Sequence, residues 1–279
     1  MHRDSVLGTG WEAHLELDFE RRGERSVLAA RRHSGPLRVQ KSLHPEGTGV
    51  CHAIVLHPPA GIAGGDSLGL QVRVGSGAHA LLTTPGAGKW YRSKGPPARQ
   101  SLLFDLQDGA ALEWLPQENI VFDGAIARTG STVRLNAGSR YLGWDLVCLG
   151  RHASGERFQS GALRIANRVE REGRPLWIEH GIIEGGGTAL QAPSVLDGHT
   201  AFGSLVAAGA DVDAIVMQAL RGIEADSGLW GVTRLPAVTL ARWLGDNAEH
   251  GRRYFVKLWQ LLRPALLGRE AAMPRIWAT

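Results

Sequence analysis

The sequence is poor in cysteine and has no long apolar run. Cys51 and Cys148 are the only two cysteines among 279 residues, which excludes a framework of several disulfides and a thiolate zinc cage. No stretch approaches the ~18 apolar residues of a transmembrane helix. The N-terminal segment also lacks the apolar core of a signal peptide. We therefore expect a soluble, cytoplasmic protein with no membrane partner.

Excess charge and nucleotide-binding motifs are also missing. Lys and Arg number 31 against 27 Asp and Glu, for a net charge of +4, which is mild for this length and argues against a nucleic-acid partner. Gly88-Lys89 is followed by Trp90 where a phosphate loop needs Ser or Thr, and Thr83 replaces its first glycine. No G-x-S-x-G motif of a serine nucleophile occurs.

Glycine is abundant, and the apolar pattern has a period of two. The 37 glycines are roughly twice the average usage and suit many tight turns. Trp11, Ala13, Leu15, Leu17 and Phe19 alternate with polar residues, as in strands with one buried face. About a dozen such runs without intervening helices predict stacked antiparallel sheets rather than alternating strands and helices.

The last third changes to helical spacing. Residues 211–224 read as an amphipathic helix. A second helix is predicted over 246–263, with Asp246 as its cap, Glu249 three residues on, and Pro264 ending it. We expect one domain over residues 1–279, β-rich over 11–205, with these two helices after it.

Several residues are candidates for chemistry. Five acids lie in or near apolar strands, which makes their burial costly unless each is paired or lines a wet cavity: Asp66, Glu113, Glu118, Asp123 and Asp145. Whether they form a site or lie on the surface stays open. Cys51 and His57 share strand parity and are weak candidate metal ligands, although a buried cysteine and satisfied histidines are favoured. Lys89, Trp90, Tyr91 and Arg92 are expected in an exposed basic-aromatic loop of the type found at protein interfaces.

Four motifs in order carry a resemblance to a known family. HPPAGIAGGD (57–66), TPGAGKWYRS (84–93), LEWLPQENIVFDGA (112–125) and WDLVCLGR (144–151) resemble the UreD (UreH) urease accessory proteins, and the likeness covers nearly the whole chain. Ala60 stands where the family usually has glycine, so that turn must tolerate a Cβ. Asn119 replaces a common threonine. Neither departure removes a charged residue.

The resemblance implies a non-enzymatic maturation factor. Such proteins bind apo-urease and UreF, UreF recruits UreG, and the assembly inserts nickel into urease. GTP is bound by UreG, so no tightly held cofactor is expected here, and nickel would pass only transiently. The fold implied is mainly β, with strands coiled into stacked sheets (β-helix or sandwich-like) and two helices. Lys89, Trp90, Tyr91 and Arg92 have side-chain types favoured at interfaces and are candidates to contact a partner; part of the face of the second helix is the alternative, although core packing is the default for its apolar residues. We also expect the chain alone to aggregate through an exposed apolar patch.

The resemblance also implies a water-filled passage for nickel. The five acids would line it, because oxygen ligands bind nickel weakly enough to release it. Replacing Glu118 or Asp66 by alanine would then lower urease activation while complexes still assemble. Two alternatives remain open: an all-β hydrolase using Glu113 or Glu118, which needs a pocket holding a carboxyl group of raised pKa, and a purely structural β module with its acids at the surface.

Overall fold

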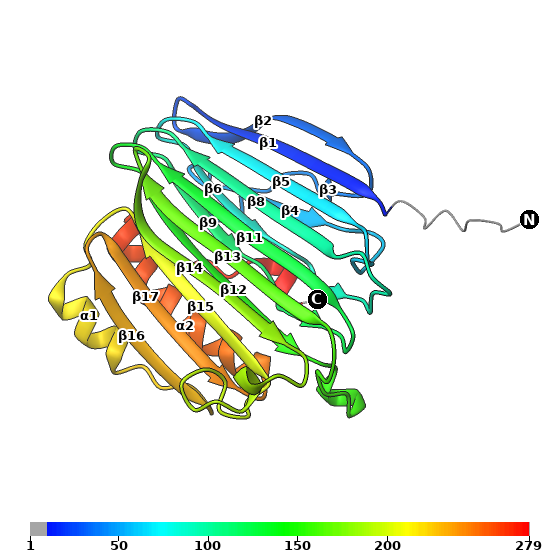
Figure 1. The fold of residues 1–279 in the computed structure, drawn as a ribbon. Helices are drawn as coiled ribbons and strands as arrows, with labels where there is room; N and C mark the ends of the chain where they lie inside the picture. Colours follow the sequence, from blue (N-terminus) through cyan, green and yellow to red (C-terminus); the bar gives the residue numbers. More distant parts are fainter. Residues whose placement is uncertain (1–9, 279) are drawn as a thin grey trace, which may run out of the picture.

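Two stacked β-sheets form the body of the molecule in the computed structural model, which describes residues 10–278. The seven-stranded sheet consists, in spatial order, of β14 (Arg174–Glu184), β13 (Ala162–Arg171), β11 (Ile126–Leu135), β8 (Ala98–Leu106), β5 (Ser67–Val74), β1 (Glu12–Arg22) and β2 (Arg25–Ser34) (Figure 1).

The ten-stranded sheet lies behind it. Its order is β16 (Leu229–Leu235), β17 (Val238–Gly245), β15 (Ala201–Ala208), β12 (Arg140–Leu149), β9 (Ala111–Leu115), β6 (His79–Thr83), β4 (Cys51–Leu56) and β3 (Arg38–Val39), with β10 (Asn119–Val121) paired to both β12 and β7 (Gly88–Trp90). Mainly β structure in stacked sheets, as the sequence predicted, is confirmed.

The chain coils between the two sheets. Strands β4, β5, β6, β8, β9, β11, β12 and β13 enter alternate sheets, so neighbours within each sheet run parallel. The expectation of antiparallel sheets is therefore wrong for the centre of the molecule. Parallel neighbours need a crossover connection, and here the strand in the opposite sheet provides it. Antiparallel pairing occurs at both edges of the seven-stranded sheet, in β1–β2 and β13–β14. In the ten-stranded sheet it covers the side formed by β12, β15, β17 and β16, and the edge pair β3–β4.

The main core fills the space between the sheets. Leu15, Leu17 and Phe19 on β1 point into it and are each at most 1% exposed, so the alternation of apolar residues is confirmed there. Trp11, which shares that parity, lies just before the strand and is 56% exposed. A second cluster fills the outer face of the ten-stranded sheet, beneath the helices.

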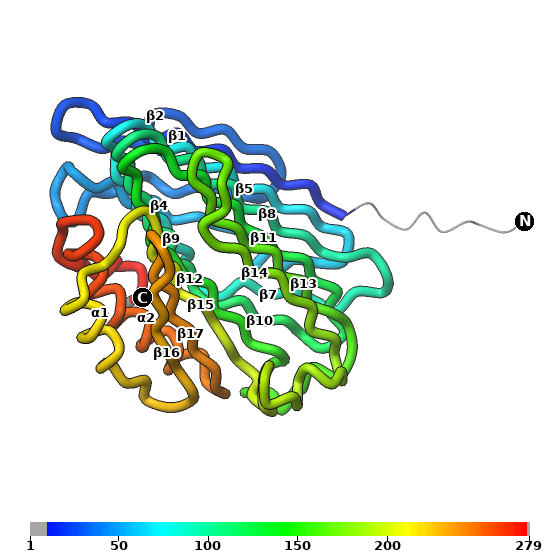
Figure 2. Tube along the Cα trace, turned by 60° about the vertical axis from the view of Figure 1, so that its left-hand side comes forward, coloured from blue at the N-terminus to red at the C-terminus, as the bar shows by residue number. Residues whose placement is uncertain are grey.

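Two α-helices, α1 (Ala214–Arg221) and α2 (Ala248–Leu267), lie in the last third as predicted. Figure 2 shows them on the side of the molecule away from β1, β5 and β8. The apolar side of α2 is buried on the ten-stranded sheet through Tyr254, Phe255, Leu258, Trp259 and Leu262. Short 3-10 turns occur at His152–Ser154, Thr188–Leu190 and Arg275–Ala278. Within residues 10–278, no helix has the length and apolar character needed to cross a membrane.

Both ends of α2 differ from the prediction. Asn247, not Asp246, is the cap, and its side chain accepts a hydrogen bond from the Glu249 amide at 3.0 Å. The Asp246 carboxylate instead accepts hydrogen bonds from Thr200. The helix continues through Pro264 for three more residues. Proline removes only the amide hydrogen bond to residue 260, and burial of the apolar Leu262 and Leu266 on either side of it offsets that loss.

Candidate functional site

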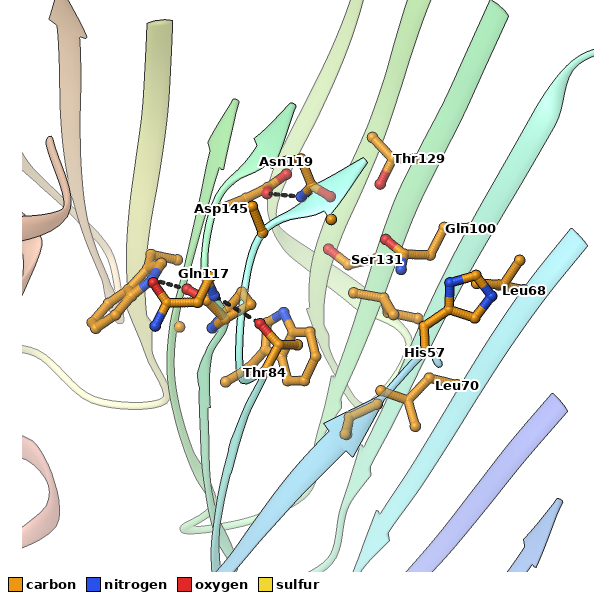
Figure 3. A pocket seen from close by; sticks show the side chains of 18 of the residues that line it. His57, Leu68, Leu70, Thr84, Gln100, Gln117, Asn119, Thr129, Ser131 and Asp145 are labelled. Carbon is orange, nitrogen blue, oxygen red and sulfur yellow. Dashed lines mark hydrogen bonds between the residues drawn. The ribbon is translucent and has the colours of Figure 1, made fainter. Parts of the chain in front are cut away.

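A cavity of about 490 Å³ lies between the two sheets. Its walls are apolar in part, from side chains such as Leu68, Leu70 and Val206. Polar side chains also point toward it (Figure 3); those lining it include His57, Thr84, Lys89, Gln100, Gln117, Asn119, Thr129, Ser131, Tyr141, Asp145, Asn167 and Ser204. The cavity therefore combines the enclosure of a core with groups that can hold water or a polar guest.

One wall carries a polar belt, which we define as Gln100, Thr129, Ser131 and Asn167. They lie on the inward side of β8, β11 and β13, where the flanking inward positions are apolar. Gln100 lies beside Thr129, and Ser131 beside Asn167, in the strand register. The Ser131 hydroxyl donates to Asn167 Oδ1 at 2.8 Å, and Asn167 Nδ2 donates to the Glu179 carboxylate at 3.2 Å. The belt thus reaches from the cavity to the edge strand β14.

Asp145 on β12 lines the cavity from the opposite sheet. Asn119 Nδ2 donates to its Oδ1 at 3.0 Å, and Asn119 Oδ1 in turn accepts from the Trp90 indole at 3.1 Å. Burial raises the pKa of Asp145, and the charge of Glu179 raises it further, against the hydrogen bond from Asn119. Asp145 is therefore the carboxyl group best placed to exchange a proton or a cation with the cavity.

His57 follows β4 and lies across the cavity from Asp145 in Figure 3. Its Nε2 is buried and has no hydrogen-bond partner among the described residues. Burial lowers the pKa of His57, and the Asp66 charge opposes that shift, so the imidazole is held in its neutral form. The following turn has Ala60 at φ 63°, which confirms that this position tolerates a Cβ in the left-handed region.

Two of the predicted acids hold loops. The Asp66 carboxylate accepts hydrogen bonds from the amides of Trp11 and Ala63, both at 2.8 Å. The Asp123 carboxylate accepts from the amides of Gln159 and Ser160, also at 2.8 Å. Burial works to raise the pKa of Asp123, but these hydrogen bonds outweigh it and lower the pKa. Neither carboxylate lines the cavity.

Glu113 lies on the other side of the ten-stranded sheet, beneath α2. It is fully buried and accepts hydrogen bonds from Trp259 Nε1 at 2.7 Å and from Arg263 Nε at 3.0 Å, while His79 Nε2 lies 2.8 Å away. Burial alone would raise the pKa of Glu113, but His79 and Arg263 lower it. The carboxylate fixes the helix to the sheet.

The same network extends to Glu46. Arg263 also donates to Glu46 at 2.7 Å, and His52 Nε2 lies 2.6 Å from the same carboxylate. Burial opposes ionisation there, but the hydrogen bonds from His52 and Arg263 lower the pKa of Glu46 to about 2. We call Glu46, His52, His79, Glu113 and Arg263 the helix clasp.

Glu118 and the two cysteines are separate from the cavity. Glu118 is half-buried, and burial followed by the Glu118 charge raises the pKa of Cys148 to about 12. Cys51 is buried in the main core at the start of β4, six residues from His57, or about 20 Å of extended chain. Within residues 10–278, no three His, Cys, Asp or Glu side chains converge closely enough to hold a metal ion.

The basic-aromatic segment is only partly exposed. Trp90 lies on β7, which pairs with β10, and is 1% exposed because its side chain packs in the main core, so the expectation of an exposed loop is wrong for this residue. Tyr91 packs edge-on against Phe122 and lies over Gly61, where any side chain would clash with its ring. Arg92 is exposed and pairs with Asp123 at 3.2 Å, and Lys89 lines the cavity.

Together, the fold and the cavity define a class of protein: a coiled, two-sheet β protein with a partly polar chamber between the sheets. The model of the UreD urease accessory protein family matches residues 12–278. The chain belongs to this family, and the resemblance inferred from the four motifs is confirmed.

Individual relatives agree over almost their full lengths. The chain is 52% identical over 272 residues to the urease accessory protein UreD of Azoarcus sp. (strain BH72), covering 97% of this chain and 95% of that protein. It is 51% identical to the protein of the same name from Dechloromonas aromatica, with 96% and 95% covered. It is 50% identical to that of Pseudomonas aeruginosa, with 99% and 98% covered.

Proposed function

We propose that this chain is a non-catalytic urease maturation factor. In this proposal it binds apo-urease and UreF, and UreG through UreF, and helps insert nickel into the urease active site. Family membership supports the role in urease maturation, because the matching relatives are named urease accessory proteins. Lysine and glycine fall at the wrong spacing for a phosphate loop, which fits GTP binding by a partner.

The cavity carries the finer part of the proposal, which is that nickel crosses the protein through it. Asp145 and the polar belt offer oxygen and amide groups on facing walls. Such ligands bind a divalent transition metal weakly, so an ion could move on rather than be trapped. His57, with its free ring nitrogen in the cavity wall, is the remaining soft ligand. In this reading, Asp66, Glu113 and Asp123 support the walls, and Glu118 lies outside them.

The hydrolase alternative, which uses Glu113 or Glu118, receives no support from the geometry, because the carboxyl group of raised pKa in the cavity is that of Asp145. Glu113 is fully buried, has three partners, and has a pKa lowered from its usual range, whereas a general acid of a hydrolase needs an accessible group of raised pKa. Glu118 is not part of the cavity wall. The structural-module alternative predicted surface acids, but none of the five candidates is exposed.

The test is urease activation in cells that carry the urease structural and accessory genes. Without this gene, urease should assemble but contain little nickel. Asp145→Ala should lower nickel content and activity while the tagged protein still recovers its partners. Asp108→Ala, in an exposed turn, is the control and should behave as wild type. Normal urease nickel content without the gene would reject the maturation role; normal activation by Asp145→Ala would reject only the route.

A further inference from the structure

Three arginines form a row on the outer face of the seven-stranded sheet. Arg99, Arg128 and Arg164 occupy the same register position on the neighbouring strands β8, β11 and β13. Their chain neighbours Ala98, Ala127 and Leu163 are buried in the core, so the arginines point outward, and all three are exposed. We call these three residues the arginine row. At ~4.8 Å between strands, it places three positive charges within about 10 Å.

The arginine row is unpaired, unlike Arg134 and Arg168 on the same face. Arg134 pairs with Asp105 and Glu170, and Arg168 pairs with Glu170. None of the three row members has an ion-pair or side-chain hydrogen-bond partner among the residues that the structure describes. The acidic residue on β14 closest in register to Arg164 is Glu184, which lies opposite Ala162. Among the described residues, Glu184 makes no ion pair with Arg164. Adjacent like charges on a sheet are destabilising, so folding alone does not favour this arrangement.

The arginine row is flanked by small residues and ends in an apolar edge. The adjacent outward row consists of the small residues Ser101, Gly130 and Ala166, and it ends at Gly69, over which the His14 ring lies. On β14, Ile182 continues the arginine row in register and is 52% exposed, and Ile178 is 48% exposed. Within residues 10–278, no helix covers this face, since α1 and α2 lie on the far side (Figure 1, Figure 2).

We propose that this face, formed by the arginine row, the small-residue row and Ile182, is a docking surface for an acidic segment of a partner protein. Charge complementarity selects the partner, because guanidinium groups pair with carboxylates in bidentate geometry. The apolar edge at Ile178 and Ile182 favours a protein over a nucleic acid, which would need stacking aromatics rather than isoleucines. The small residues let an extended segment lie against the sheet.

The direct test measures binding of a defined probe to the purified protein. The probe is a fluorescein-labelled 12-residue peptide of Glu, Asp and Leu, followed by anisotropy. Arg99→Glu/Arg128→Glu/Arg164→Glu should bind at least about ten-fold more weakly than wild type. Binding by wild type should weaken as NaCl rises from about 0.05 to about 0.5 M.

A matched control carries the same net charge. Arg31→Glu/Arg174→Glu/Arg234→Glu changes three exposed arginines on β2, β14 and β16, and it should bind like wild type. Thermal melting of both triple variants verifies that they fold. Equal weakening by both, or no weakening by the row variant, would overturn the proposal. Tighter binding of a single-stranded oligonucleotide of equal charge would do so as well.

A second experiment extends the inference to the proposed function and rests on it. In urease-expressing cells, the tagged row variant should recover at least one urease subunit or accessory protein about ten-fold less efficiently than the control variant. Equal recovery of all of them would overturn the docking surface. The proposed function would fail by a different result, namely that urease acquires nickel without this protein.

Discussion

Replacing Glu113 by alanine separates a structural role from a role in nickel passage. The change leaves the fully buried Arg263 without the carboxylate 3.0 Å from its Nε, and leaves the Trp259 indole without its acceptor. Removing one partner of a buried ion pair costs about 3–5 kcal/mol. Glu46 still pairs with Arg263 at 2.7 Å, so we expect the lower end, about 3 kcal/mol. Glu113→Gln keeps an acceptor for Trp259 and should cost about 1–2 kcal/mol.

Urea unfolding followed by tryptophan fluorescence measures this loss, because the Trp259 indole donates a hydrogen bond to Glu113 of the helix clasp. In thermal unfolding, about 3 kcal/mol corresponds to a fall of about 6–12 °C for a protein of this size. Arg263→Met removes the buried cation that Glu113→Ala leaves without its partner. The double variant should therefore lose less stability than the sum of the losses in the two single variants.

Unfolding of Glu113→Ala at the same urea concentration as wild type would show that Glu113 does not hold α2 to the sheet. If urease nickel content also fell while that variant stayed folded and bound to its partners, Glu113 would belong to the nickel route after all. If Glu113→Ala is less stable but the folded fraction still activates urease normally, the role of Glu113 is to hold α2 to the sheet.

Three further changes test other parts of the structure. Asp145→Asn should raise the melting temperature near pH 7. Because the pKa of Asp145 is raised in the folded protein, stability falls as the pH rises from the usual carboxyl pKa towards the raised one. The neutral amide does not ionise, so the variant does not lose this stability. Glu46→Gln should make the free energy of unfolding depend less on pH under acidic conditions. The pKa of Glu46 is lowered from 4.5 to about 2. Its carboxylate therefore contributes stability that is present above pH 4.5 and is lost as the pH falls towards 2. Tyr254→Phe should stabilise by about 1 kcal/mol in urea unfolding, because the buried hydroxyl has no partner among the described residues.

Alternation of apolar residues predicted which faces are buried but not how the strands pair. A period of two is the same for parallel and antiparallel neighbours, and the turns between strands gave no direction. The hairpin β16–β17 was also missed, because it lies between two helical patterns. Its turn contains Pro236-Ala237, with Ala237 at φ 57°. An alanine in that conformation hides the glycine signal by which such turns are usually recognised.

The candidate acids were chosen for their apolar neighbours, and that criterion could not separate the two faces of a sheet. Glu113 and Asp145 both satisfy it, yet one lies under α2 and the other in the cavity. Each partner of Glu113 comes from a segment distant in sequence, such as Arg263 on the last helix. Local sequence therefore cannot reveal that its charge is already satisfied.

The polar belt was missed although the sequence carries its signal. Gln100, Thr129, Ser131 and Asn167 occupy positions whose parity, counted from buried neighbours such as Leu102 and Val133, points inward. A polar residue at an inward position is the informative deviation in a strand, and four of them in neighbouring strands mark one region. That region becomes recognisable only when β8, β11 and β13 are known to be adjacent and in register.

The belt and Asp145 also bear on why the cavity exists. Leucine or valine occupies the next inward positions along the same strands, at Leu102, Val133 and Val169, so the fold accommodates apolar side chains there. Burying polar groups with incomplete partners costs about 1–3 kcal/mol each, and a raised pKa at Asp145 is a direct sign of such a cost. If the cavity were only part of the structural core, apolar residues at the positions of the polar belt and Asp145 would make the fold more stable. If the cavity serves passage, Asp145→Asn must therefore do two opposite things: raise stability and lower the nickel content of urease. A variant that gains stability with no loss of nickel delivery would show that the buried carboxyl group has no part in the route.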